Sequence, residues 1–425
     1  MGNVRTVMVY LFEKYLLLVF SIFLVFAPFS NQVVKAVYCN AAFGWLMINI
    51  FKHKQKFYRG LIPKTALNKP MLFFLGSCIL SILFSLDPYH SQGVFFDRFL
   101  VYFLLFWIAA GFAATSRKNL SILIGVFILW NFVFAAGGVR DYFYYRLVNP
   151  DLAERIWSTF GKRIIYYGFP LYLTYFIPFN FFVLLLSKNR WLKGAGLANL
   201  FLLLPCLFWN SSRIAWVAVV LSIASGIIVK KKKAALLSLA VLILLLSITF
   251  LFPKTRDRIK TIPFPSEWSN RMPLYRSAFA IFRDYPALGA GIGMFEKVLH
   301  RPKYELPKDY PVPKELNLHA HNTYLEVAAE MGIAGLFTFL WIFAVFFTMA
   351  WHWTRGSTGS GSPKNENHAI FLGLAGSIVA MLIFAFGTTI ITVGITVSSY
   401  FWFLMGLAAG LFAREEPAPK IPVAK

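Results

Sequence analysis

The chain alternates between long apolar runs and short polar connections. A membrane-spanning helix needs about 20 predominantly apolar residues to cross about 30 Å of hydrocarbon, and twelve runs reach or approach this length. They lie at residues 8–28, 33–51, 70–86, 96–114, 120–139, 165–187, 194–210, 213–229, 234–252, 331–351, 368–386 and 394–413. The pattern predicts an all-α, polytopic membrane protein of about 12 transmembrane helices.

One long polar stretch interrupts the apolar runs and divides the chain. We expect transmembrane helices 1–9 within residues 1–252, a long loop with short helices at 253–330, transmembrane helices 10–12 at 331–413, and a tail at 414–425. Composition agrees with this class, because hydrophobic residues make up 58% of the chain and charged residues only 14%. The first apolar run carries Glu13 and Lys14 and no small-residue cleavage site follows it, so we expect a retained helix rather than a cleaved signal peptide.

Lys and Arg gather in every second connection between the runs. The basic connections lie at residues 52–69, 117–118, 188–193, 230–233 and 355–364, whereas the intervening short connections carry almost no positive charge. Because cytoplasmic loops are the basic ones, both termini are expected in the cytoplasm and the long loop on the periplasmic face of a bacterial inner membrane. The net charge of +24 then reflects contact with anionic membrane lipids, and no nucleic acid partner is expected.

The long loop contains a predicted amphipathic helix that follows Arg271. Leu274, Ala278, Ile281 and Phe282 recur at helical spacing, and Pro286 ends the pattern. The Gly-Ala-Gly-Ile-Gly segment at 289–293 follows, where the backbone can approach a neighbour closely. It does not predict nucleotide binding, because no βαβ unit precedes it and its third glycine is misplaced for that fingerprint.

Arg213 stands at the start of an apolar run, directly after Ser211 and Ser212. Such a charge is costly unless it faces a cavity, a partner or the interface, and extension of the side chain to lipid headgroups is the alternative interpretation. The topology places Arg213 on the same face as Arg271 and His321. A serine that caps the following helix would leave the positive helix end beside Arg213, which favours a diphosphate site.

The loop ends on His-Ala-His-Asn-Thr-Tyr-Leu-Glu at 319–326. A metal pair at His319 and His321 is disfavoured, because no further ligand stands at suitable spacing. A histidine with a near-normal pKa is instead a base at neutral pH. Glu326 also suits the first turn of the following helix for purely structural reasons.

Two further outer segments carry candidate chemistry. Asp97 and Arg98 either compensate each other or leave Arg98 to bind substrate. The connection from Arg140 to Arg163 is rich in aromatic residues, which is typical of an interfacial belt and, less commonly, of a sugar-stacking surface. The candidate substrate-binding residues are Arg98, Arg276, His319, Asn322, Tyr324 and Glu326.

Three blocks of the sequence resemble the O-antigen ligase and polymerase superfamily. They are Ser211–Val217, Arg271–Gly293 and His321–Leu336, and together with their surroundings they span about a third of the chain. Val217 stands where leucine is usual in the family, and Tyr275 stands where tryptophan is frequent. Both departures are conservative.

The resemblance implies a metal-independent glycosyl transfer without a cofactor. The donor would be an undecaprenyl-pyrophosphate-linked glycan, and the acceptor a hydroxyl of the lipid A-core in ligases or of another lipid-linked repeat unit in polymerases. It implies that Arg213 and Arg271 are the two essential arginines and that His321 is the essential histidine. Two guanidinium groups can stabilise the charge that develops on a leaving diphosphate, and the histidine can accept the proton of the acceptor.

Several functions remain open at this point. We favour a ligase, because a single long outer loop with the histidine block near its end suits that branch. An O-antigen polymerase and a protein O-oligosaccharyltransferase are alternatives within the enzyme class. A polysaccharide transporter is disfavoured, because the middle of the spans is nearly free of charge and no half-to-half repeat is evident.

Overall fold

The computed structural model describes residues 2–53, 56–148, 158–163, 168–225, 271–304, 306, 310, 318–356, 366–390 and 394–415. The helices are α1 (Gly2–Phe26), η1 (Ala27–Phe29), α2 (Asn31–His53), α3 (Tyr58–Leu61), α4 (Asn68–Leu83), α5 (Pro88–Val94), η3 (Phe95–Phe99), α6 (Leu100–Thr115), α7 (Arg117–Val148), α8 (Gly168–Leu186), α9 (Arg190–Asn210), α10 (Arg213–Ala224), α13 (Met272–Asp284), α14 (Phe295–Leu299), α15 (Thr323–Gly356), α16 (Glu366–Phe384) and α17 (Ile395–Glu415). The strands β1 (Ser158–Thr159) and β2 (Lys162–Arg163) pair antiparallel.

The predicted fold class is confirmed. Nine helices in the described part of the chain are long and apolar enough to cross a membrane, and α4 and α10 are shorter apolar helices. Every predicted run except 234–252 coincides at least in part with a described helix, and that run lies outside the described residues. The chain is therefore an all-α, multi-pass membrane protein.

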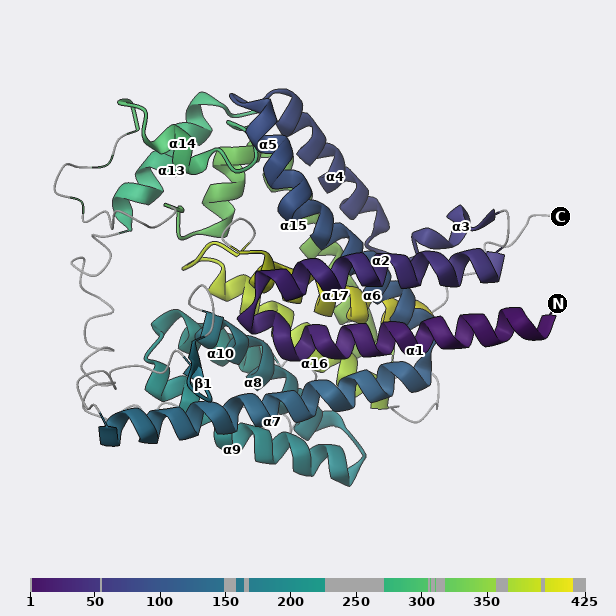
Figure 1. Ribbon diagram of the computed structural model, residues 1–425. Coiled ribbons are helices and arrows are strands. Elements are labelled where there is room, and N and C mark those ends of the chain that lie inside the picture. Colours follow the sequence, from purple (N-terminus) through teal and green to yellow (C-terminus); the bar gives the residue numbers. More distant parts are fainter. Residues whose placement is uncertain are drawn as a thin grey trace.

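The centre of the bundle is formed by α6, α8, α16 and α17 (Figure 1). Small residues let α17 approach α6 closely: a Cβ at Gly410 would lie only 2.0 Å from the carbonyl oxygen of Ala110. Buried aromatic rings fill the space beside this contact, and the rings of Tyr172 and Tyr400 meet edge to face at 5.1 Å. Small residues at the contact and dispersion between rings are the usual means by which helices associate in lipid.

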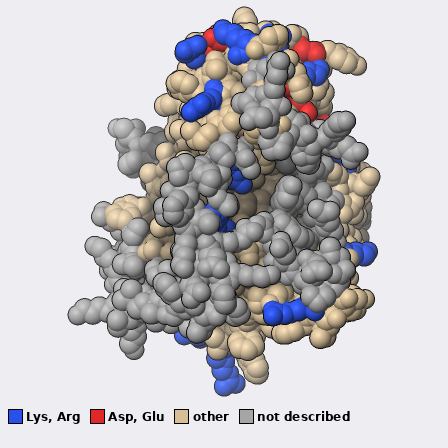
Figure 2. Space-filling model, turned by 90° about the vertical axis from the view of Figure 1, so that its left-hand side faces the viewer, with Lys and Arg blue, Asp and Glu red and all other residues tan. Residues whose placement is uncertain are grey.

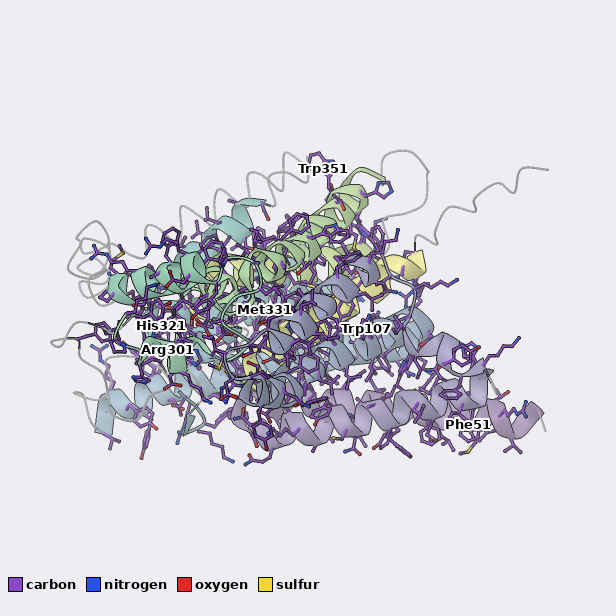
Figure 3. All side chains as sticks on the ribbon, turned by 90° about the horizontal axis from the view of Figure 1, so that it is seen from above. Phe51, Trp107, Arg301, His321, Met331 and Trp351 are labelled. Carbon is purple, nitrogen blue, oxygen red and sulfur yellow. The ribbon has the colours of Figure 1, made fainter. Side chains whose placement is uncertain are left out.

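The two ends of the bundle differ in composition. Figure 3 places His321 and Phe51 at opposite ends of the molecule. Near Phe51, whose ring stacks on Phe12 at 6.0 Å, Lys14 donates a hydrogen bond to Asn119 at the start of α7. Basic connections such as 52–69 and 117–118 therefore lie at the end away from His321, as the alternation of charge along the chain predicts.

The helix α15 is interrupted where the outer loop meets the membrane span. Gly332 has φ 63° and ψ −163°, a conformation that breaks the helix. The backbone N–H groups of Ile333 and Ala334 donate to Pro286 and Ala287 at 2.8 and 3.2 Å instead of to their own helix. The break lies beside residue 330, the expected end of the loop.

Candidate functional site

The predicted amphipathic helix is confirmed as α13, which begins directly after Arg271. Leu274, Ala278 and Ile281 are almost fully buried beneath it, and α13 packs against α15. The helix ends at Asp284, two residues before Pro286. Its buried apolar face therefore fixes Arg271 at one end of a short, well-packed element.

The glycine segment after α13 packs against the break in α15. Gly289 and Gly332 both have positive φ, and a Cβ at either would lie within 2.4 Å of a backbone carbonyl carbon of the facing segment. Ala290 and Gly291 donate to the carbonyl groups of Ala329 and Glu330, both at 2.9 Å. The close backbone approach predicted from the glycines is confirmed, and the partner is the protein's own helix.

Arg271 and the start of α10 meet at Gly387, in the connection between α16 and α17. The Nη1 atom of Arg271 donates to the carbonyl oxygen of Gly387 at 2.8 Å. A Cβ at Gly387 would lie 2.9 Å from Cγ1 of Ile214 and 3.4 Å from Nη1 of Arg271. Since Arg213 directly precedes Ile214, the structure brings the N-terminus of α10 and Arg271 to the same turn.

The turn before α10 differs from the prediction in one detail. Ser212 occupies the N-cap position, but its side chain makes no capping hydrogen bond. Ser211 adopts the left-handed conformation with φ 58°, and its hydroxyl donates back to Phe208 of α9. Serine capping of α10 is therefore not seen, whereas the positive end of α10 does begin at Arg213.

His321 lies just before α15 in a strained backbone conformation. Its φ is 51°, which is uncommon for a residue with a side chain. Burial, and then the positive charge of Arg271, lowers the pKa of the His321 imidazole to about 4. The expectation of a near-normal pKa is thus wrong, because sequence does not show how deeply the ring is buried or that a cation lies beside it.

The carboxylate of Glu326 organises the loop around His321. Its side chain is 1% exposed. Oε2 accepts hydrogen bonds from the backbone N–H of Ala320 at 2.8 Å and from the hydroxyl of Thr389 at 2.7 Å. Oε1 lies 3.0 Å from Nδ1 of His319. With both oxygens engaged inside the protein, the geometry favours a positioning role for Glu326 over direct contact with substrate.

His319 contacts Glu326 directly, and the two form an ion pair when the imidazole is protonated. Burial lowers the pKa of the His319 imidazole, but the charge and hydrogen bond of Glu326 more than offset it, so the pKa is raised above its ordinary value. The positive charge of Arg98 acts to lower the pKa of the same imidazole. His319 thus lies beside the buried acid, and Arg98 is close enough to act on it electrostatically.

Two other candidates make hydrogen bonds that stabilise the fold, and a third, Arg276, lies apart from them. Oδ1 of Asn322 caps α15 by accepting from the backbone N–H groups of Tyr324 and Leu325, and the phenol of Tyr324 donates to Leu382 at 2.8 Å. Arg276 is exposed on α13, five positions and about 140° of helical rotation from Arg271. The geometry does not place Arg276 with the other candidates.

Arg98 stands in η3, a single π-helical turn between α5 and α6. Such turns are frequent at functional sites. The neighbouring Asp97 forms an ion pair with Lys35 of α2. Asp97 is therefore compensated by a cation outside its own segment, and both alternatives for Arg98 stay predictions.

The connection between α16 and α17 was not recognised from the sequence as part of the site. Besides Gly387 and Thr389, it supplies the carbonyl of Thr388, which accepts from the hydroxyl of Thr323 at 2.9 Å. The backbone N–H of Thr323 donates to Ala385 at 2.9 Å. Two glycines and three threonines in an otherwise apolar region, at residues 385–394, are a sequence signal that could have marked it.

Figure 2 shows the end of the molecule that carries α13 and α14. Lys and Arg atoms are visible in a hollow near the middle of this face, and further basic side chains with a few acidic ones gather at the top of the view. Ion pairs of this outer region join Lys297 to Asp87 at 3.0 Å and Lys303 to Asp284 at 2.6 Å. The hollow is thus a basic recess, whereas some of the charges in the outer region are paired.

Comparison with known proteins agrees with this geometry. Residues 198–340, a third of the chain, match a family described as O-antigen ligase, and the predicted resemblance is confirmed. The matched segment contains Arg213, Arg271 and His321. No curated protein sequence matches the chain. The match supports a function of the O-antigen ligase or polymerase type, and members of that family are glycosyltransferase-like enzymes that use lipid-linked glycans.

Proposed function

We propose that this protein is a glycosyltransferase of the O-antigen ligase type, with its site on the periplasmic face of a bacterial inner membrane. The donor is a glycan on undecaprenyl pyrophosphate and the acceptor a hydroxyl of a lipid A-core sugar. One observation supports this most: Arg271 and the start of α10, with Arg213, meet at Gly387, while the charge of Arg271 acts on His321. Two cations and a base at one recess suit transfer from a diphosphate.

The two arginines bind the leaving group in this proposal. The acceptor oxygen forms a bond to the anomeric carbon of the donor sugar, and the bond from that carbon to the pyrophosphate oxygen breaks. The electron pair stays on the pyrophosphate, where the guanidinium groups of Arg213 and Arg271 stabilise the added charge. The N-terminal end of α10 adds a favourable dipole at the same place.

His321 accepts the proton of the acceptor hydroxyl. In the free protein Arg271 disfavours the protonated imidazole, which makes it a weak base. A diphosphate bound to Arg271 supplies negative charge, offsets this effect and raises the pKa of His321 toward its ordinary value. The base therefore becomes stronger when the donor is bound, and water in the empty site is not activated.

Glu326 and His319 hold His321 in place. A left-handed residue persists only when its surroundings fix it, and the carboxylate of Glu326 fixes this turn through Ala320 and Thr389. Arg98, whose charge acts on His319, completes the positive surroundings of the recess.

The direct test is transfer by purified protein in detergent, with a lipid-linked glycan and lipid A-core as substrates. The wild-type protein is expected to join the two, and His321→Ala to accumulate and fold but not transfer. Absence of transfer by the wild-type protein would overturn the proposal. If the protein instead lengthens the glycan on its lipid carrier when no lipid A-core is present, it is a polymerase.

A gene disruption separates ligase from polymerase in cells. Loss of a ligase leaves lipid-linked polymer intact while surface lipid A-core carries no ladder. Loss of a polymerase leaves lipid A-core capped with single repeat units. We expect the first pattern.

A further inference from the structure

The helix α7 is longer than a membrane span requires. Its 32 residues extend about 48 Å at 1.5 Å per residue, whereas the hydrocarbon is about 30 Å thick. The last part, from Arg140 to Val148, carries exposed aromatic, aliphatic and arginine side chains. Figure 1 shows this end of α7 projecting on the same side of the molecule as α13.

A buried acid fixes this projecting end to the hairpin of β1 and β2. The carboxylate of Asp141 is fully buried and accepts hydrogen bonds from the Ser158 hydroxyl at 2.6 Å and the Gly161 N–H at 2.7 Å. Arg140 donates to the same carboxylate at 2.8 Å. The end of α7 is therefore rigidly placed.

Aromatic rings and arginines gather at this end of α7. The rings of Tyr142 and Trp209 stack at 3.9 Å with planes 3° apart, and Phe143 meets the edge of Trp209 at 5.7 Å. Arg146 donates to the phenol of Tyr142 at 2.6 Å. Tyr144 is exposed on the adjoining side of α7, about 100° around the helix from Phe143, and the guanidinium of Arg140 lies over its ring at 4.7 Å. Tyr142, Phe143, Tyr144 and Trp209 are called the α7 ledge below.

The α7 ledge adjoins the recess through α9. Trp209 stands in the last turn of α9, and the tight turn at Ser211 leads directly to Arg213 at the start of α10. Trp209, which stacks on Tyr142, therefore lies four residues before Arg213, the arginine that binds diphosphate in the proposed reaction. A ligand held at Arg213 can extend onto these rings.

The chemistry of the α7 ledge suits sugar rings. A pyranose presents apolar C–H groups on its faces and hydroxyl groups around its edge, so aromatic faces flanked by guanidinium donors match both. Phe143 is 53% exposed and Tyr144 is 45% exposed, so both side chains are accessible to a ligand. The first sugar of the donor must offer its anomeric carbon to the acceptor, so it is the later sugars that reach the ledge.

We propose that the α7 ledge binds the outer sugars of the glycan carried by the lipid-linked donor. This inference rests on the proposed function. The ledge adds to donor affinity only when the glycan is long enough to reach it. The diphosphate contacts of Arg213 and Arg271 act on donors of any length.

A lipid-facing belt is the competing explanation, and the chain offers a matched control for it. Leu147 lies one helical turn after Phe143 on the same face of α7 and is 83% exposed. If this face only contacts lipid, Leu147→Ala should change the KM for the donor at least as much as Phe143→Ala does. If this face binds sugars by ring contact, only Phe143→Ala should change the KM for the donor.

The experiment compares two donors, undecaprenyl pyrophosphate with one sugar and with several repeat units. For Phe143→Ala we expect KM for the long donor to rise about tenfold, with kcat and the KM for the one-sugar donor unchanged. Phe143→Tyr should restore the wild-type KM and Leu147→Ala should retain it. Tyr144→Ala provides a second ring deletion if Phe143→Ala fails to fold.

The proposal is overturned if Phe143→Ala leaves the KM for the long donor unchanged. It is also overturned if Phe143→Ala raises the KM for both donors equally, or if Leu147→Ala raises the KM for the long donor as much as Phe143→Ala does. These outcomes require a wild-type protein that transfers. They are therefore distinct from failure of the proposed function, in which the wild-type protein transfers neither donor.

Discussion

The guanidinium of Arg271 donates to the carbonyl oxygen of Gly387 at 2.8 Å, although 116 positions separate the two residues in sequence. Two residues after Gly387, the hydroxyl of Thr389 donates to Glu326 at 2.7 Å, and Glu326 holds the turn of His321. One short connection therefore locates both the cation and the base. Disturbing it should affect both.

Replacement of Arg271 tests the diphosphate contact. Loss of one charge-stabilising donor costs enzymes about a hundredfold in kcat, so we expect Arg271→Ala to lose about that much. Arg271→Lys should recover little, because a lysine does not present the fork of donors. Transfer by purified protein measures both. Arg283→Ala, an exposed arginine in the last turn of α13, is the control and should transfer normally; full activity of the lysine variant would contradict a bidentate contact.

Thr389 tests whether the connection positions His321. Thr389→Val removes a donor from a buried carboxylate, which costs about 1–3 kcal/mol, and we expect kcat to fall about tenfold with little change in the KM for donor. Thr389→Ser keeps the hydroxyl and should retain most of the activity. Equal kcat values for the valine and serine variants would show that the hydrogen bond to Glu326 has no part in catalysis.

The pH dependence tests the link between Arg271 and His321. A base must be deprotonated, and burial with the charge of Arg271 lowers the pKa of free His321 to about 4. The acid limb of kcat/KM, which reports the free enzyme, should therefore lie near pH 4. The bound diphosphate raises this pKa, so the acid limb of kcat should lie at higher pH. Coincident limbs, or a kcat/KM limb near 6.5, would contradict the assignment.

Gly332 tests the packing of the loop on α15. A Cβ there would lie 2.4 Å from the carbonyl carbon of Ala287, and φ is 63°. Gly332→Ala should therefore lower the thermal unfolding midpoint in detergent by several degrees. Gly194→Ala is the control, because open space surrounds that helical glycine and alanine favours the helix. Similar midpoints for the two variants would contradict the close approach.

Labelling tests the proposed orientation. Tyr89, at the start of α5, is 89% exposed, and Lys188 is exposed at the other end of the bundle. With the three native cysteines replaced, a membrane-impermeant maleimide should label Tyr89→Cys in cells with a permeabilised outer membrane, but Lys188→Cys only after lysis. The reverse pattern would place the recess in the cytoplasm.

Much of the architecture could be predicted from sequence because the signals are local. The length of each apolar run marks a span, and the spacing of Leu274, Ala278 and Ile281 marks α13. The alternation of basic connections also separates the two ends of the bundle. Each of these depends on residues within a few turns of one another.

The remaining parts of the site depend on contacts between distant residues. No local pattern pairs Arg271 with Gly387, or Asp97 with Lys35 of α2. The low pKa of His321 depends on burial and on a cation 50 positions away in the chain. Residue types alone identified Glu326 as a candidate, but only its three partners favour positioning over substrate contact.

The interruption of α15 ties the outer loop to the span that follows it. Four hydrogen bonds with residues 286–291 satisfy the backbone groups on either side of Gly332. A shortened protein that lacks those residues would carry unpaired peptide groups at the mouth of the membrane, where each is expensive. The loop is therefore no detachable module. Engineering that exchanges it between homologous proteins must move the first half of α15 with it.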